Sequence, residues 1–165
     1  MKFIKQVKER ETLMSYWIFI CTSHDTIDGY IESSEIYRQR MIDKFWGLGE
    51  RTAHRKSLRK NDKVIFYVGN PSAIFAGCTV LNSSAFLRTA EHDLKYGHRK
   101  EIFHSAYAVF LDEVEIWKKP IFVPNIANEL DFIKKPKIWG TYLQGGIREI
   151  SLHDFNTIIQ KSKDH

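Results

Sequence analysis

Apolar side chains fall into short runs along the chain, and β-branched and aromatic residues dominate these runs. Residues 16–22 are apolar at nearly every position, which predicts a central strand with both faces covered. Further runs predict strands at residues 63–68, 74–81 and 147–150, and an alternating pattern predicts a longer strand over residues 107–117. The chain is therefore expected to build its core mainly from strands.

Two segments show the periodicity of amphipathic helices. Residues 25–42 carry apolar side chains at three- and four-residue steps, which predicts a helix with one apolar face. A final helix is expected to begin at Ser151, because Ser151 and Asp154 form a capping pair ahead of a second apolar face. Irregular segments are expected at residues 44–49, 82–104 and 134–146.

Strands without helical crossovers, together with two flanking helices, predict an α+β domain. Its centre is expected to be a curled, barrel-like sheet of about five or six strands. Gly77 lies inside one predicted strand and indicates a bulge or a close backbone approach, since glycine has no side chain to pack. The length of 165 residues fits one domain. We expect this domain to span residues 15–165 and residues 1–14 to form a charged N-terminal extension.

The composition is that of an ordinary globular protein, with 43% hydrophobic and 27% charged residues. No apolar run has the length of a transmembrane helix, and the N-terminus lacks the apolar stretch of a signal peptide. A cytoplasmic location and no membrane partner are therefore expected. Cys21 and Cys78 lie in strand-like runs and are expected to be buried free thiols, because the chain has no C-x-x-C pair.

Positive charge is concentrated in two segments. The net charge is +5, and residues 51–63 alone contain six lysines and arginines against one aspartate. Residues 134–148 contain Lys134, Lys135, Lys137 and Arg148 and no acid. Two basic segments in a small domain indicate a polyanionic partner, most simply a nucleic-acid backbone. The alternative is an ordinary solvated surface of lysines and arginines.

Residue patterns that carry enzyme chemistry are missing from the sequence. The chain has no G-x-S-x-G, P-loop, H-E-x-x-H or G-x-G-x-x-G motif. His92, His98 and His104 recur at six-residue steps, but no acid or cysteine accompanies them at a metal-ligand spacing. No catalytic residue, metal or cofactor is therefore expected.

Two tryptophans stand beside glycines and basic residues. Trp46 precedes Gly47 and the first basic segment, and Trp139 lies between Lys137 and Gly140. A flat indole is a surface on which a nucleobase stacks, with a gain of roughly 1–3 kcal/mol per base. The alternative is that both tryptophans are core or loop-anchoring residues.

The order of these segments resembles a known family. The segments YWIFICT, FWGLGER, NDKVIFYV and IFAGCTVL, followed by the C-terminal stretch ELDFIKKPKIWGTYLQGGIREISLHDFNTII, are similar to those of EVE domains over residues 15–161. The resemblance implies a PUA-like fold, a small curled β-barrel with flanking helices, related to the YTH domain. It also implies a non-catalytic pocket that captures a single, often modified base, for example a methylated one, from DNA or RNA.

The resemblance assigns roles to individual residues. Trp46 matches a cage tryptophan of YTH domains, and Gly47 matches a small residue whose backbone lies near the base. Our hypothesis is that Trp46 and Trp139 sandwich the base while the backbone at Gly47 reads its edge. Further pocket residues are expected to be Trp17, Thr22, Ser23 and Asn70. Phosphate contacts are expected from Arg51, Arg55, Lys56, Arg59, Lys137 and Arg148. Further cage aromatics are available at Phe86, Tyr96 and Phe103.

Two other classes of function remain open from the sequence. One is an RNA-processing or RNA-modifying enzyme of the PUA-like superfamily. The other is an adaptor whose exposed aromatic residues contact another protein. Nucleic acid is the expected partner under the main hypothesis. The modification, the choice between DNA and RNA, and the oligomeric state are left open.

Overall fold

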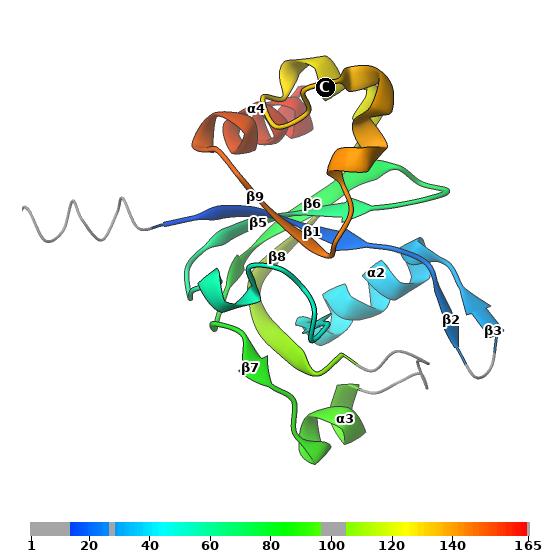
Figure 1. The fold of residues 1–165 in the computed structure, drawn as a ribbon, viewed down its shortest axis with the longest axis vertical. Coiled ribbons are helices and arrows are strands. Elements are labelled where there is room, and N and C mark those ends of the chain that lie inside the picture. Colours follow the sequence, from blue (N-terminus) through cyan, green and yellow to red (C-terminus); the bar gives the residue numbers. More distant parts are fainter. Residues whose placement is uncertain (1–13, 27–28, 97–104, 165) are drawn as a thin grey trace, which may run out of the picture.

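A strongly curled sheet forms the centre of the computed structural model, which describes residues 14–26, 29–96 and 105–164 (Figure 1). The strand order is β4-β8-β6-β5-β1-β9, and β7 pairs with β8 beside this path. β1 and β5 run parallel, and the other neighbours in the sheet are antiparallel. The strands are β1 (Tyr16–Cys21), β4 (Phe45–Leu48), β5 (Lys63–Val68), β6 (Ile74–Leu81), β7 (Phe86–Leu87), β8 (Tyr107–Phe122) and β9 (Ile147–Ile150).

Alternation along the central strands separates two hydrophobic clusters. On β1, Trp17, Phe19 and Cys21 belong to one cluster, and Ile18 and Ile20 belong to the other. Helix α2 (Ser33–Asp43) covers the first cluster, and α4 (Leu152–Lys163) covers the second from the opposite face of the sheet (Figure 1). The prediction of a central first strand with both faces covered is confirmed, as are the α+β class and the curled sheet.

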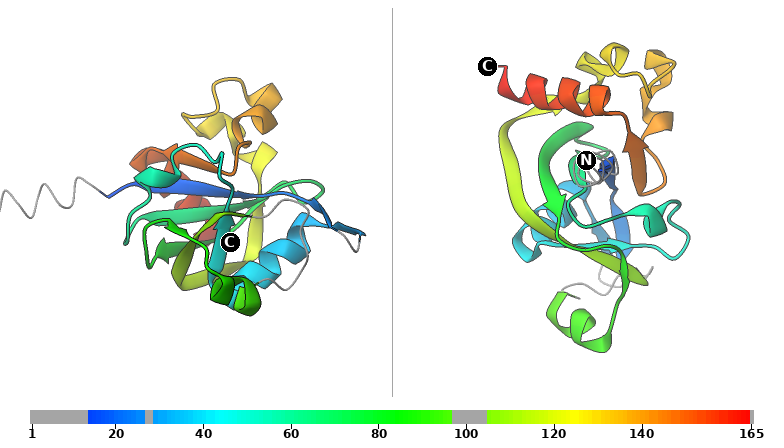
Figure 2. Two further views of the ribbon diagram at one scale, coloured as in Figure 1. Left: turned by 60° about the horizontal axis from the view of Figure 1, so that its bottom comes forward. Right: turned by 90° about the vertical axis from the view of Figure 1, so that its left-hand side faces the viewer.

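The curl is produced largely by β8. Its first residues pair with β4, and its remaining residues pair with β6, so one strand bends around the barrel (Figure 2). The bend coincides with irregular register between β6 and β8 and with a positive φ of 47° at Glu113. The strand is therefore longer than residues 107–117, because a bulge allows it to continue around the corner.

The predicted helix over residues 25–42 is wrong in its first half. Short strands β2 (His24–Thr26) and β3 (Gly29–Ile31) form a hairpin there, and it projects from the sheet (Figure 1). Gly29 has a φ of 118°, which is outside the helical region, and Tyr30 is 64% exposed. Tyr30 therefore fits the three- and four-residue spacing of a helix without being part of a buried helix face.

The three segments that were expected to be irregular, residues 44–49, 82–104 and 134–146, contain regular structure, the last of them as η4. Residues 45–48 form β4, since their apolar side chains are buried against the barrel. Residues 82–104 include β7 and α3 (Ala90–Tyr96), and residues 97–104 lie outside the described residues. The expected N-terminal extension lies outside them too, except for Met14. Single-turn 3₁₀ helices are η1 (Arg55–Ser57), η2 (Val123–Asn125) and η3 (Ala127–Glu129), and η4 (Pro136–Tyr142) is longer.

The start of α4 follows the predicted capping pattern. The Asp154 backbone N–H donates to Ser151 Oγ at 3.1 Å, and Ser151 itself has extended backbone angles. The Asp154 carboxylate accepts hydrogen bonds from the backbone N–H groups of Asp131 at 2.8 Å and Phe132 at 3.0 Å. The capping pair therefore also fixes α4 to the segment that precedes η4.

A buried carboxylate joins the first residues of β1 to those of β5. Asp62 is 2% exposed and accepts hydrogen bonds from Trp17 Nε1 at 3.0 Å, from the Ser15 backbone N–H at 3.1 Å and from the Arg59 backbone N–H at 3.0 Å. These donors compensate the loss of hydration on burial. They also fix the register at which the parallel pair begins.

None of the helices in the described ranges has both the length and the hydropathy that a bilayer-spanning helix needs.

Gly77 shows how closely β6 and β8 approach each other. A Cβ atom at this position would lie 2.2 Å from the Glu115 carbonyl oxygen and 2.7 Å from the Tyr37 hydroxyl. We therefore expect Gly77→Ala to lower the free energy of unfolding by about 3 kcal/mol or more, since a backbone has to move. The measurement is urea denaturation followed by circular dichroism.

Gly140→Ala is the matched control, because a Cβ atom there has no neighbour within 4 Å. Its free energy of unfolding should stay within about 0.5 kcal/mol of the wild-type value. Equal stabilities of the two variants would contradict the close approach.

Candidate functional site

A cavity of about 230 Å³ lies at the C-terminal end of β1. Its walls come from segments far apart in the sequence: the end of β1 and the residues after it, α2, β4 with the following loop, and the loop before β9. The lining residues are Ile20, Thr22, His24, Arg40, Trp46, Gly47, Leu48, Gly49, Thr52, Ser105, Gly145 and Gly146.

The loop before β9 is held against β1 by a backbone hydrogen bond. The Ile20 backbone N–H donates to the Gly146 carbonyl oxygen at 2.7 Å. Gly145 and Gly146 have φ angles of 91° and 87°, which side chains rarely allow. A Cβ atom on Gly146 would lie 3.4 Å from Thr52 Cγ2, so the loops that follow β4 and precede β9 meet at Thr52.

Gly47 provides room for a hydroxyl group on the cavity wall. A Cβ atom at Gly47 would lie 2.6 Å from Ser105 Oγ and 2.9 Å from Ser105 Cβ. Both residues line the cavity. The absence of a side chain at Gly47 therefore allows Ser105 to sit directly against β4.

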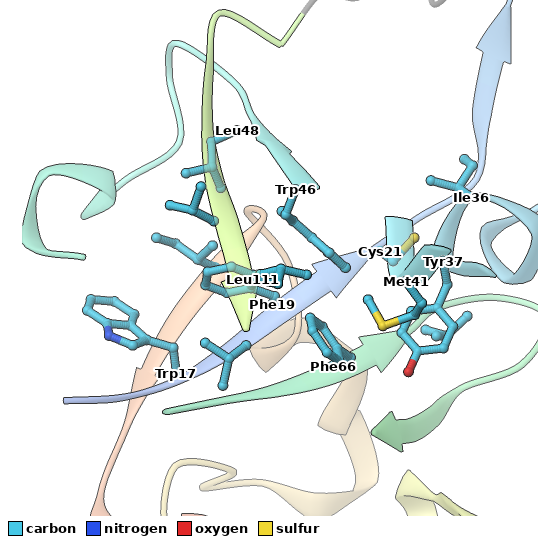
Figure 3. Close-up of a cluster of buried hydrophobic side chains, with 14 of the residues drawn as sticks. Trp17, Phe19, Cys21, Ile36, Tyr37, Met41, Trp46, Leu48, Phe66 and Leu111 are labelled. Atoms are coloured by element: carbon cyan, nitrogen blue, oxygen red, sulfur yellow. The ribbon is translucent and has the colours of Figure 1, made fainter. Parts of the chain in front are cut away.

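Trp46 belongs both to the core and to the cavity wall. Its side chain is 1% exposed, and its indole stacks on Phe66 with ring centroids 5.1 Å apart and planes inclined by 19°. Phe19 packs against it at 5.5 Å (Figure 3). Cζ of Arg40, another lining residue, lies 4.4 Å from the centroid of the same indole. The indole is therefore held rigidly between core and cavity.

The lining combines apolar side chains with hydrogen-bonding groups. Leu48 and Trp46 supply apolar surface, and the hydroxyl groups come from Thr22, Thr52 and Ser105. The four lining glycines bring backbone groups close to the cavity, and Arg40 contributes a positive charge. No carboxylate is found among the described lining residues. Such a site suits a flat, polar-edged ligand without a positive charge.

Three of the predicted pocket residues meet at this cavity: Trp46, Gly47 and Thr22. Ser23 and Asn70 do not line it. Ser23 Oγ accepts from the Ser33 backbone N–H at 3.0 Å and donates to the Asn70 carbonyl oxygen at 3.3 Å. The single hydroxyl proton of Ser33 is shared between the same carbonyl, 3.0 Å from Oγ, and that of Gly69 at 3.1 Å. Ser23 and the Asn70 backbone thus position the start of α2.

The other two predicted tryptophans lie elsewhere. Trp17 is fully buried at the start of β1, away from Trp46 (Figure 3). Its indole N–H donates a hydrogen bond to Asp62. Trp139, on η4, packs against the cluster under α4 and meets Tyr67 edge-on at 6.3 Å. The predicted sandwich of Trp46 and Trp139 is wrong, because the sheet separates the two indoles.

The predicted phosphate-binding residues fall into two groups. Arg51, Lys56 and Arg59 are exposed on the segment between β4 and β5, whose Thr52 lines the cavity. Arg55 lies in the same segment, but its Cζ atom stacks 4.0 Å above the Tyr107 ring. Arg51 therefore adjoins a lining residue, whereas the Arg59 backbone bonds Asp62 at the start of β5, toward the other end of β1.

The second group is on the other face of the sheet. Lys137 is exposed on η4, and Arg148 is half-buried on β9. Cζ of Arg148 lies 4.9 Å from the Phe132 ring centroid, and its Nη1 donates to the Tyr142 carbonyl oxygen at 3.5 Å. Both Phe132 and Tyr142 pack in the cluster under α4. Lys137 and Arg148 are therefore separated from the cavity.

An aromatic cluster on the other side of β4 contains two of the expected cage candidates. Tyr96 stacks on Phe45 at 4.2 Å and 11°, and Phe86 stacks on Phe110 at 4.9 Å. His92 packs among these rings, 5.0 Å from Phe86. This cluster attaches α3 and β7 to the sheet and does not line the cavity. Phe103, His98 and His104 lie outside the described residues.

One group of metal-ligand atoms occurs among the described residues, formed by Asp131, His153 and Asp154 within 4.8 Å of one another. Both carboxylate oxygens of Asp154 already accept backbone hydrogen bonds. His153 and Asp131 lie 4.0 Å apart on the exposed surface. The geometry fits a structural link between α4 and its neighbouring loop.

Sequence reasoning missed three important lining residues: Arg40, Thr52 and Ser105. Arg40 and Thr52 lie in segments that carry several other polar and basic residues, so no local pattern distinguishes them. The Gly145-Gly146 dipeptide was a usable signal, since paired glycines mark a backbone that other residues cannot adopt.

Comparisons with known proteins show the fold. No family model and no curated protein matches the sequence. Among solved structures, a hypothetical protein from Leishmania major aligns with a TM-score of 0.60 and 13% identity, over 91% of this chain and 95% of that one. Human THYN1, solved in complex with 5-methylcytosine-containing DNA, aligns with a TM-score of 0.59 and 13% identity, over 92% and 99%.

An NMR structure of a Rhodopseudomonas palustris protein also aligns over nearly the whole chain. The TM-score is 0.58 at 11% identity, covering 92% of this chain and 97% of that one. At these identities the alignments show a shared backbone arrangement. The chain has a PUA-like fold, and the expected likeness to EVE domains is confirmed at the level of structure.

The Cys78 thiol gives a test of the local electrostatics. Burial, reinforced by the Glu115 carboxylate, raises the pKa of Cys78 to about 11. Its Sγ lies 3.6 Å from Glu115 Oε2, so the hydrogen bond favours the protonated thiol. Because only the thiolate is alkylated, reaction with iodoacetamide should be slow at neutral pH and rise about tenfold per pH unit in the alkaline range. Peptide mass spectrometry distinguishes Cys78 from the buried Cys21.

Glu115→Gln removes the negative charge and should lower the pKa of Cys78. We expect at least a roughly threefold faster alkylation near neutral pH, since one pKa unit corresponds to about a tenfold change in thiolate. Glu149→Gln, an exposed acid on β9, should leave the rate unchanged. An unchanged rate in Glu115→Gln would contradict the assigned cause.

Proposed function

We propose that this protein binds nucleic acid and captures a single modified base in the cavity beside Trp46, without catalysing a reaction. The observation that carries the proposal is the cavity itself. Trp46, Gly47 and Thr22 meet there, and the exposed Arg51 adjoins the lining residue Thr52. The shared fold with a protein solved on 5-methylcytosine-containing DNA supports this function and makes methylated cytosine the first ligand to test.

The size of the cavity fits one nucleobase. Its volume of about 230 Å³ is below the roughly 300–1,000 Å³ of sites for drug-sized ligands, so it suits a single base better than a whole nucleotide. The sugar and phosphates of the nucleotide would remain outside, where basic side chains are exposed.

The lining offers separate contacts for each part of a base. The hydroxyl groups of Thr22, Thr52 and Ser105 and nearby backbone groups can pair with its polar edge. Leu48 supplies apolar surface for a methyl group. A base in a duplex must first leave the stack, and the cost of a few kcal/mol is met by contacts in the pocket.

Exposed basic residues on the segment between β4 and β5 provide the attraction to the backbone. Arg51, Lys56 and Arg59 lie on the segment that contains Thr52. Contacts between such residues and phosphates release counterions, so affinity falls with salt and does not depend on sequence. Selectivity for the modified base is then a property of the cavity and general affinity a property of this segment.

The test is to fill the cavity at its rim. We expect the wild-type protein to bind an oligonucleotide with one modified base more tightly than its unmodified counterpart, and Thr52→Phe to lose this preference. Thr52 is half-buried between two loops, so the larger ring enters the cavity without entering the core. Fluorescence anisotropy is measured with DNA and RNA carrying 5-methylcytosine or 6-methyladenine.

Thr141→Phe is the matched control, since Thr141 is exposed on η4, on the other face of the sheet. It should keep the wild-type preference. If wild-type protein bound modified and unmodified oligonucleotides equally, the proposed function would be wrong. If Thr52→Phe kept the preference, the base would bind elsewhere.

The basic segment gives a second prediction. Arg51→Ala and Lys56→Ala should each weaken binding of modified and unmodified oligonucleotides equally. Each should also reduce the slope of log affinity against log salt by about 0.7–0.9. Lys137→Ala, on the face away from the cavity, should change neither quantity. A change in modified-base preference for Arg51→Ala or Lys56→Ala would contradict the separation of roles.

A further inference from the structure

We propose that the captured base stacks on the guanidinium of Arg40, which the Trp46 indole supports, and that the site therefore selects neutral modified bases over cationic ones. This inference rests on the proposed function of the cavity. It assigns to Arg40 the role of a binding and specificity-determining residue, and it divides modified bases into those that the cavity accepts and those that it rejects.

The position of Arg40 carries the first step. Phe66 belongs to the buried cluster and stacks on Trp46, whereas Arg40 lines the cavity and lies 4.4 Å from the centroid of the same indole. The surface that Trp46 offers toward the cavity is thus covered by a guanidinium. A base entering the cavity meets Arg40 before it meets the indole.

The surroundings of Arg40 leave its hydrogen-bond donors available. The Arg40 guanidinium makes a cation–π contact with Trp46, and within residues 14–26, 29–96 and 105–164 this side chain has no ion pair or hydrogen bond. Arg88, by comparison, pairs with Asp93 at 2.9 Å. The guanidinium lies against the indole, and its N–H groups remain able to meet a ligand.

The chemistry of a guanidinium suits such a platform. It is planar and delocalised, and it stacks on aromatic rings on either face. Nucleobases stack on arginine planes as they do on aromatic side chains. The resulting order, Phe66, Trp46, Arg40 and base, places a cation between two π systems, and each of them attracts it.

The same arrangement penalises a ligand that carries a positive charge. A base methylated on a ring nitrogen, such as 3-methylcytosine or 1-methyladenine, is a cation near neutral pH. Stacked on Arg40, it would face a like charge at about 4 Å, and the described lining has no carboxylate to compensate. We expect such a base to bind at least about tenfold more weakly than its neutral isomer.

A different role for Arg40 makes the opposite prediction. If Arg40 only covered Trp46 and had to leave before a base could stack on the indole, removing it would tighten binding. If the base stacks on Arg40, removing it weakens binding. The sign of the change in affinity therefore distinguishes a platform from a cover.

The experiment uses two pairs of isomers in one oligonucleotide sequence: 5-methylcytosine with 3-methylcytosine, and 6-methyladenine with 1-methyladenine. Dissociation constants are measured by fluorescence anisotropy at neutral pH for wild type, Arg40→Ala, Arg40→Lys and Arg38→Ala. Arg38 is exposed on the same helix and serves as the control. Thermal unfolding confirms that each variant is folded.

For the neutral base that wild type selects, we expect Arg40→Ala to weaken binding by about tenfold or more and Arg38→Ala to leave it unchanged. Arg40→Ala should also lose discrimination against the cationic isomer. Arg40→Lys should weaken binding of the neutral base but keep that discrimination, because the charge remains and the plane is lost. Tighter or unchanged binding by Arg40→Ala, or undiminished discrimination, overturns the inference. Failure of wild type to select any modified base overturns the proposed function itself.

Discussion

The stacking of Trp46 on Phe66 connects the hydrophobic core to the cavity, and the site depends on this contact. Phe66 is fully buried on the central strand β5, so the indole that rests on it cannot move without disturbing the core. Arg40 in turn lies on the indole. Phe66 thus fixes the position of Trp46, and Trp46 fixes that of Arg40, so the cavity wall is as well ordered as the core. A site built in this way is ordered before its ligand arrives, which reduces the entropy lost on binding.

Alternation along β1 and β5 determines which parts of the chain can act together. One face of the sheet holds Trp46, α2 and the cavity, while the other is closed by α4 and the 3₁₀ segments. Lys137 and Arg148 of the second basic segment lie on this other face. Lys137 and Arg148 therefore resemble the first basic segment in composition but differ from it in position. Two surfaces of similar charge need not bind the same partner.

Much of the fold could be predicted, because burial on both sides leaves uninterrupted apolar runs in β1, β5 and β6. The hairpin before α2 could not, since the spacing around Tyr30 imitates a helix and only the backbone at Gly29 excludes one. Trp46, Gly47 and Thr22 were found through a resemblance that preserves the order of segments. Trp139 was wrongly assigned to the pocket, because the sequence around a loop tryptophan does not show which face of the sheet the side chain covers. Arg40 was missed because its partner lies on another element and is brought to it only by folding.

The hydrogen bond from Ile20 to Gly146 has a consequence for how the molecule is made. It joins the first strand to a loop near the end of the chain, and the cavity is complete only when that loop is in place. Contacts so distant in sequence form late, and during synthesis the ribosome releases the N-terminal residues first. The basic segment after β4 thus emerges well before the glycine loop. A nascent chain therefore carries the exposed positive charge of that segment before its cavity is complete.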